Sequence, residues 1–340
     1  MKKIISLLVI AIFAVAMVSG CGINKNESGK KLSIVTTIFP EYDWVKNIVG
    51  SEKNVDITML LDSGVDLHSY QPSAEDILKI SKCDMFVYVG GESDEWVEDA
   101  LKEASNKNMR VVYLMDILGN KAKEEEEVEG MQEEAEHEED GEHEKVEEHD
   151  DAHENDEEHD ETEYDEHVWL SLKNASYLCE KVEENLERID KKNKEKYRNN
   201  LVKYQKEIQS LDSKYNETTK VAKIKTLVFG DRFPFRYLTD DYGLKYYAAF
   251  KGCSAETEAS FKTIKFLANK TDELKLNNVM TIDGSDKKIA KTIVENTKNK
   301  DQSILTLDSM QSIVSKDVEK GANYIDIMKK NLEVIKQALQ

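Results

Sequence analysis

The chain has 340 residues, of which 39% are hydrophobic, and this length is typical of about two domains with cores of their own. The formal net charge of −21 is unevenly distributed, because residues 124–166 contain 26 acidic residues and one lysine and the rest of the chain carries +4. A near-neutral body without a concentrated basic face argues against nucleic-acid binding.

The N-terminus predicts an export signal over residues 1–20. Two lysines precede an apolar run from Ile4 to Val18, which is shorter than the ~20 residues of a membrane span, so a retained membrane anchor is the weaker alternative. The sequence VSGC, ending at Cys21, resembles the lipobox of bacterial lipoproteins. That resemblance implies cleavage before Cys21, lipid on its sulfur and an extracytoplasmic protein anchored to the cell membrane. Residues 21–31 would then be a polar tether.

Strands alternate with helices in the first half of the chain. The apolar runs predict strands over 32–39, 55–61, 85–90 and 110–115, and the spacing of apolar residues predicts helices over 42–50, 73–84 and 94–105. Ser73, followed by Asp76 three residues later, is typical of a capping box at a helix start. Alternating strands and helices indicate a parallel sheet covered on both faces, so residues 32–168 are predicted to form an N-terminal α/β lobe.

The second half repeats this pattern over residues 221–340, which are predicted to form a C-terminal α/β lobe. Strands are expected over 225–230, 245–250, 277–283 and 303–310, and helices over 260–274, 287–298 and 323–339. Residues 169–220 contain no proline or glycine and begin with an amphipathic pattern, which predicts a linking helix, with a break near Asn193 left open. A coiled coil is the weaker alternative, because heptads are not sustained. The fold class is therefore α/β, with two parallel-sheet lobes joined by a long linking α-helix.

Residues 122–166 form an acidic insert within the first lobe. Their high charge and few apolar residues predict disorder. Five histidines in 23 residues favour an auxiliary metal-collecting role over a merely solubilising acidic loop: His137, His143, His149, His153 and His159.

The other two histidines, His68 and His167, have neighbours typical of folded segments. His68 follows a predicted strand, and ligands bind beyond the carboxyl ends of strands in open α/β sheets. The same rule selects Asp231, Asp283 and Glu258 in the second lobe. Each alone has a simpler explanation as a surface or helix-capping residue, so each signal is weak when taken individually.

Several motifs together resemble the zinc- and manganese-type metal-binding lipoproteins of bacterial ABC importers. They are IVTTIFP, HSYQPS with His68, MFVYVGG, the His-rich acidic insert, DEHVWLS with His167, DDYGL and SDKKIAKT. The resemblance implies two α/β lobes on a rigid helix, with a metal bound by His68, His167, a third His or Glu, and Asp283. It also implies that the protein delivers the metal to a membrane permease, which works with its own ATPase.

Arg232 departs from the family pattern, because it occupies the position expected for the third ligand and a guanidinium cannot bind a cation. Three replacements stay open: Asp231, Glu258 or a water molecule. A further alternative is that Arg232 pairs with Glu258 and orients it.

Two imidazoles with carboxylates suit zinc and also tolerate manganese, and the histidine-rich insert favours Zn²⁺ over Mn²⁺. The competing functions are a metal-dependent hydrolase and an adhesin of the same fold. The chain lacks H-E-x-x-H, G-x-S-x-G and the phosphate-binding loop of ATPases, so an enzyme is not expected. Beyond Cys21, Cys83 is expected in the core, and a Cys179–Cys253 disulfide is left open.

Overall fold

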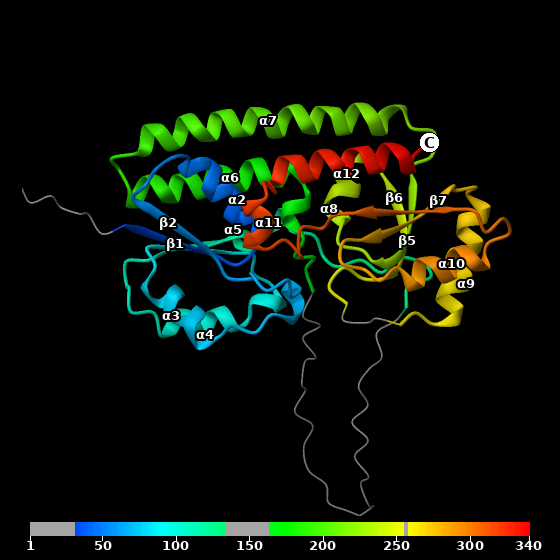
Figure 1. The fold of residues 1–340 in the computed structure, drawn as a ribbon, viewed down its shortest axis with the longest axis horizontal. Coiled ribbons are helices and arrows are strands. Elements are labelled where there is room, and N and C mark those ends of the chain that lie inside the picture. Colours follow the sequence, from blue (N-terminus) through cyan, green and yellow to red (C-terminus); the bar gives the residue numbers. More distant parts are fainter. Residues whose placement is uncertain (1–30, 133–162, 255–257) are drawn as a thin grey trace, which may run out of the picture.

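The computed structural model describes residues 31–132, 163–254 and 258–340, which form two α/β lobes side by side (Figure 1). The predicted fold class is confirmed. The expected signal and Cys21 lie outside the described residues, as do the five histidines of the insert. No helix in the described part of the chain is long and apolar enough to span a membrane.

The N-terminal lobe has a four-stranded parallel sheet in the order β2-β1-β3-β4. Its strands are β1 (Leu32–Thr36), β2 (Val55–Met59), β3 (Met85–Tyr88) and β4 (Arg110–Tyr113). Its helices are α2 (Phe39–Val49), α3 (Ala74–Lys82), α4 (Trp96–Lys102) and α5 (Leu114–Leu118), and its short 3-10 helices are η1 (Leu67–Ser69), η2 (Glu92–Asp94), η3 (Gly119–Lys121) and η4 (Val168–Leu170). The predicted capping box at Ser73 and Asp76 opens α3.

The C-terminal lobe repeats the arrangement, with the parallel order β6-β5-β7-β8. Its strands are β5 (Thr226–Arg232), β6 (Lys245–Phe250), β7 (Asn278–Ile282) and β8 (Ser303–Leu307). Its helices are α8 (Arg236–Tyr242), α9 (Phe261–Glu273), α10 (Lys288–Asn296), α11 (Ser315–Glu319) and α12 (Tyr324–Ala338). The strand order is the same in both lobes. Because the strands of each sheet are parallel, their carboxyl ends meet at one edge, where ligands bind in folds of this class.

The linking segment consists of two helices, α6 (Leu172–Ile189) and α7 (Lys194–Val221), where one long helix was the main expectation. Asp190 ends α6, and its carboxylate accepts hydrogen bonds from Tyr197 Oη at 2.6 Å and Asn193 Nδ2 at 2.7 Å. The chain therefore reverses at the break near Asn193 that the sequence left open. After this reversal α7 returns alongside α6 and continues across both lobes (Figure 1).

Buried side chains from both lobes meet beneath α7. Asp43 of α2 accepts hydrogen bonds from Tyr204 Oη of α7 and from the backbone N–H of Tyr324 in α12, both at 3.2 Å. The rings of Trp44 and Tyr324 pack edge to face with centroids 5.6 Å apart. Burial raises the pKa of Asp43 to about 6. The C-terminal helix thus packs against the first helix of the other lobe.

The edges of the acidic insert are folded, which corrects the prediction that all of residues 122–166 are disordered. Residues 122–132, here called the strap, cross to the C-terminal lobe, where the Gln132 N–H donates to Ala249 O at 2.9 Å. Glu126 pairs with Arg236, and Glu124 forms an antiparallel bridge with Tyr164. Composition averaged over the whole insert concealed these specific partners.

Cys83, Cys179 and Cys253 are all free thiols, so the open alternative of a Cys179–Cys253 disulfide is wrong. Cys83 is fully buried in the core, as expected.

Candidate metal site

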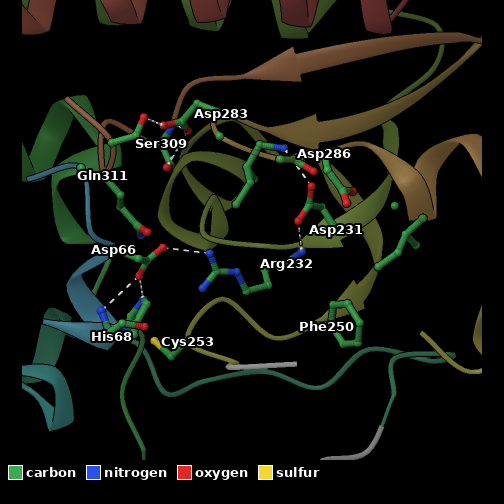
Figure 2. A pocket seen from close by; sticks show the side chains of 18 residues that line it. Asp66, His68, Asp231, Arg232, Phe250, Cys253, Asp283, Asp286, Ser309 and Gln311 are labelled. Atoms are coloured by element: carbon green, nitrogen blue, oxygen red, sulfur yellow. Dashed lines mark hydrogen bonds and ion pairs between the residues drawn. The ribbon is translucent and has the colours of Figure 1, made fainter. Parts of the chain in front are cut away.

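A cavity of about 500 Å³ lies between the lobes, where the carboxyl ends of both sheets meet. Figure 2 shows its two sides, with His68 and Cys253 at one end and Asp231 and Asp283 on the wall formed by the C-terminal lobe. Polar side chains after strands of both sheets therefore face one enclosed space, as the strand-end rule predicted.

His68 lies in η1, after β2, with its side chain 9% exposed. Asp66 caps η1 by accepting from the His68 backbone N–H at 3.1 Å, and Ser93 Oγ lies 2.7 Å from His68 Nδ1. Burial and the neighbouring His167 lower the pKa of His68 to about 3. The imidazole is therefore neutral at physiological pH, with Nε2 turned away from Ser93.

His167 is fully buried immediately before η4. Asp165 Oδ1 lies 2.9 Å from its backbone nitrogen and 3.1 Å from Nδ1, so this carboxylate fixes the ring. Burial acts to lower the pKa of His167, but Asp165, with Glu166 and Glu125, outweighs it and raises the pKa above its ordinary value. A histidine oriented by a carboxylate on one ring nitrogen is typical of metal ligands.

The two imidazoles face one another, with 3.3 Å between His68 Nε2 and His167 Nε2. Each Nδ1 has a partner on the protein side, so the two rings present their Nε2 atoms to one another. The two histidines named from sequence, 99 positions apart, are thus brought together by the fold.

Cys253 joins this pair, and sequence reasoning missed it as a ligand. Its Sγ and one ring nitrogen each of His68 and His167 lie within 4.8 Å of one another. Gly252 permits this approach, because a Cβ there would lie 2.9 Å from Phe233 O and 3.1 Å from His167 Cε1. Cys253 follows β6, so the strand-end rule that selected Asp283 after β7 would also have found it.

Gln311, after β8, also reaches the pair and was also missed. With its amide oriented to satisfy both ends, Gln311 Oε1 accepts from His167 Nε2 at 2.6 Å and its nitrogen donates to Asp66 Oδ2 at 2.7 Å. An amide is a weak sequence signal for a ligand, because it carries no charge and is common on surfaces.

Arg232 pairs with Asp66 at 2.8 Å, which replaces the suggested partnership with Glu258. Its other terminal nitrogen donates to Ser254 O at 3.4 Å. Burial acts to raise the pKa of Asp66, but Arg232 and His68 outweigh it and lower the pKa. Arg232 therefore connects the loop that holds His68 to the segment that holds Cys253.

The three carboxylates named from sequence lie apart from the imidazoles. Asp283 Oδ1 accepts from Ser309 at 2.6 and 2.7 Å and Oδ2 accepts from Ser312 at 2.5 Å. Asp231 accepts from the backbone N–H groups of Arg232 at 3.0 Å and Ile282 at 3.4 Å.

Both aspartates line the cavity, but their hydrogen bonds hold them to the C-terminal lobe. Glu258 is exposed and does not line the cavity. Strand ends alone did not distinguish a free ligand from an oxygen that already has hydrogen-bond donors.

A second cavity of about 260 Å³ adjoins the site, sharing His68 and Cys253 with the first. The remaining lining residues are mostly acidic: Glu92, Ser93, Glu125, Glu163, Tyr164 and Glu166. Carboxylates on this side make the surroundings of the imidazole pair favourable to a cation.

The chain is similar to known zinc-binding proteins. The chain is 33% identical to the zinc-binding lipoprotein AdcA of Streptococcus pneumoniae R6 over 99% of its length, and spans 61% of that protein. It is 31% identical to the high-affinity zinc uptake system protein ZnuA of Bacillus subtilis, covering 95% of this chain and 94% of the relative.

Two solved structures share the fold. The Zn(II)-bound ZnuA-like domain of Streptococcus pneumoniae AdcA matches with a TM-score of 0.66 and 26% identity, covering 91% of this chain and 99% of that one. The laminin-binding protein of Streptococcus agalactiae matches with a TM-score of 0.69 and 23% identity, covering 91% of this chain and 100% of that one. This match shows the fold alone. The family model described as zinc-uptake complex component A, periplasmic, matches residues 34–338, and the chain belongs to this family.

Proposed function

We propose that this protein is the extracytoplasmic solute-binding component of an ABC importer for zinc. It captures Zn²⁺ between its lobes and delivers it to a membrane permease driven by a separate ATPase. The observation that carries this proposal is the pair of facing Nε2 atoms, 3.3 Å apart at an interlobe cavity. Both curated relatives described above are named for zinc binding or zinc uptake.

His68 and His167 are the proposed ligands that the fold supplies from two separate motifs. Two nitrogens bound to tetrahedral zinc at ~2.0–2.1 Å would lie about 3.4 Å apart, close to the separation found here. Asp231, Asp283 and Glu258 are not retained in the ligand set, because the first two have donors within their own lobe and the third is exposed. Zinc is favoured over manganese, since manganese prefers oxygen ligands.

Zinc titration against a competing chelator tests the proposal. The background is the full chain with His137, His143, His149, His153 and His159 each replaced by glutamine, so that the insert contributes no imidazole. We expect one tight site, which His68→Ala and His167→Ala together weaken at least about 100-fold, equivalent to ~2.7 kcal/mol. Tight binding that survives in the double variant would refute the site.

The histidines of the insert are proposed to collect metal at weak auxiliary sites. Comparison of the unsubstituted chain with the glutamine background isolates them, because the folded strap is unchanged in both. We expect the unsubstituted chain to bind additional zinc weakly while the affinity of the tight site stays the same. Equal zinc stoichiometry in the two proteins would contradict the collecting role.

Anchoring through lipid on Cys21 is the proposed basis of membrane attachment, and the relative in Streptococcus pneumoniae is named a lipoprotein. Cys21→Ala should leave the precursor unprocessed or release the protein from the membrane fraction, because no thiol remains to be acylated. Cell fractionation with immunoblotting measures this. Normal processing together with membrane retention would contradict the anchor.

A further inference from the structure

Among the residues that the structure describes, His68, His167 and Cys253 form the one group of three metal-binding side chains whose ligand atoms lie within 4.8 Å of one another. We propose that the Cys253 thiolate is the third protein ligand of the transported metal, making a two-histidine, one-cysteine site for zinc. This inference rests on the proposed function and assigns the ligand that Arg232 cannot provide.

The geometry requires only a small adjustment of the thiol. The two Nε2 atoms already have the separation of a tetrahedral edge, at 3.3 Å. With Zn–S near 2.3 Å and Zn–N near 2.0–2.1 Å, Sγ must lie about 3.6 Å from each nitrogen. The sulfur and one nitrogen of each ring already lie within 4.8 Å of one another, so a rotation of the Cys253 side chain that moves Sγ by on the order of 1 Å supplies this geometry.

A glycine and two hydrogen bonds place the Cys253 segment against the imidazoles. Gly252 allows the backbone to approach His167 closely. Glu125, from the strap, accepts from the Cys253 backbone N–H at 3.2 Å, and Arg232 donates to the adjacent Ser254 carbonyl at 3.4 Å. The thiol is therefore positioned by its neighbours on both sides, and Figure 2 shows its sulfur beside His68.

In the proposed reaction zinc replaces the proton of the Cys253 thiol, and no electron is transferred. The thiol loses its proton to water as the S–Zn bond forms, so the thiolate neutralises one of the two positive charges of the bound zinc. A thiolate is a soft ligand that suits zinc and adds little affinity for manganese. Cys253 would therefore raise the selectivity of the site for zinc over manganese, which the two imidazoles alone do not fix.

Cobalt(II) is the probe for the thiolate, because a Co–S bond gives a charge-transfer absorption in the near ultraviolet. The full chain in the glutamine background is titrated with cobalt(II) alone, and zinc and manganese affinities are measured by chelator competition. Cys253→Ser is the test variant and Cys253→Ala the second, in case one fails to fold. Cys179→Ala, which removes a thiol buried away from the site, is the matched control.

We expect the near-ultraviolet band in the parent and in Cys179→Ala, and its loss in Cys253→Ser. Zinc affinity should fall at least about tenfold in Cys253→Ser, while manganese affinity changes less than about threefold. A band that persists, or zinc affinity within threefold of the parent, overturns the assignment of Cys253. If His68→Ala weakens zinc binding in that case, the proposed function stands and only the third ligand is wrong.

Discussion

The two sides of the interlobe cavity differ in the hydrogen bonds that their polar side chains make within the protein. On one side, His68 and His167 use Nδ1 for hydrogen bonds and leave Nε2 facing its counterpart. On the other side, Asp283 accepts from two serines and Asp231 from two backbone N–H groups. One side of the cavity thus brings ring nitrogens from two separate motifs together, whereas the other holds its carboxylates by hydrogen bonds within one lobe. The convergence of ligand atoms, more than residue type, identifies the site.

Substitution of Asp165 should have the largest effect on the imidazole side of the cavity, because its carboxylate fixes the ring of His167 through Nδ1. Asp165→Asn keeps the size and an acceptor but removes the charge, so it should lower zinc affinity by roughly 10- to 100-fold. Chelator competition in the glutamine background measures the change. An affinity within threefold of the parent would show that the ring needs no carboxylate support.

The pH dependence should separate the two imidazoles. His68, with its pKa lowered to about 3, stays neutral above about pH 4 and does not compete with zinc there. The pKa of His167 is raised, so zinc must displace a proton from it as pH falls through that value. The contribution of His167 to zinc affinity should be fully present above its pKa and should fall by about tenfold per pH unit below it.

Asp165→Asn is the matched variant for the pH measurement. Loss of the carboxylate lowers the pKa of His167, so the decline in zinc affinity should begin at a lower pH than in the parent. Titrations from pH 5 to 8 provide both curves. Superimposable profiles would mean that His167 is not the group whose proton competes.

Gln311→Glu should introduce a carboxylate beside the imidazole of His167. The side-chain oxygen of Gln311 already lies 2.6 Å from His167 Nε2, so a glutamate would present a negative charge next to the metal. We expect zinc affinity to rise by about fivefold to tenfold and manganese affinity to rise at least as much. Competition titrations with both metals measure this, and unchanged affinity for both would place Gln311 outside the site.

Asp283→Asn should have the smallest effect on zinc binding. It tests the side of the cavity whose carboxylates are held within the C-terminal lobe. Zinc affinity should change less than about threefold, because the carboxylate is held by Ser309 and Ser312. The free energy of unfolding should instead fall by roughly 1–3 kcal/mol, since these hydrogen bonds are weakened. Urea unfolding and zinc titration of the same sample separate the two outcomes. A large loss of affinity with unchanged stability would restore Asp283 as a ligand.

The sequence predicted the alternating lobes because strand and helix periodicities were strong and local. It also predicted His68 and His167, which are the two histidines outside the insert. It missed Cys253 because a lone cysteine was considered as a disulfide partner, and Gln311 because an amide is an ordinary surface residue. The orientation of Asp283 could not be predicted, since it depends on serines 26 and 29 residues away that only the folded chain brings near.

The same limit explains the strap and the linking helices. Glu126 is one of many acidic residues in its segment, and only the fold gives it Arg236 as a partner. The sequence left a break near Asn193 open, and the reversal between α6 and α7 depends on Asp190 accepting from Asn193 and Tyr197, which the apolar spacing does not encode.

The packing of α12 against α2 has a consequence for cooperativity. Because Tyr324 reaches Asp43 and Trp44 in the other lobe, and α7 covers both, neither lobe can unfold without exposing apolar surface of its neighbour. Separate domains would melt in two steps, whereas a shared core couples them. Scanning calorimetry should therefore record one unfolding transition. The protein should behave as a single folding unit with a cleft, and not as two independently folding domains joined by a helix.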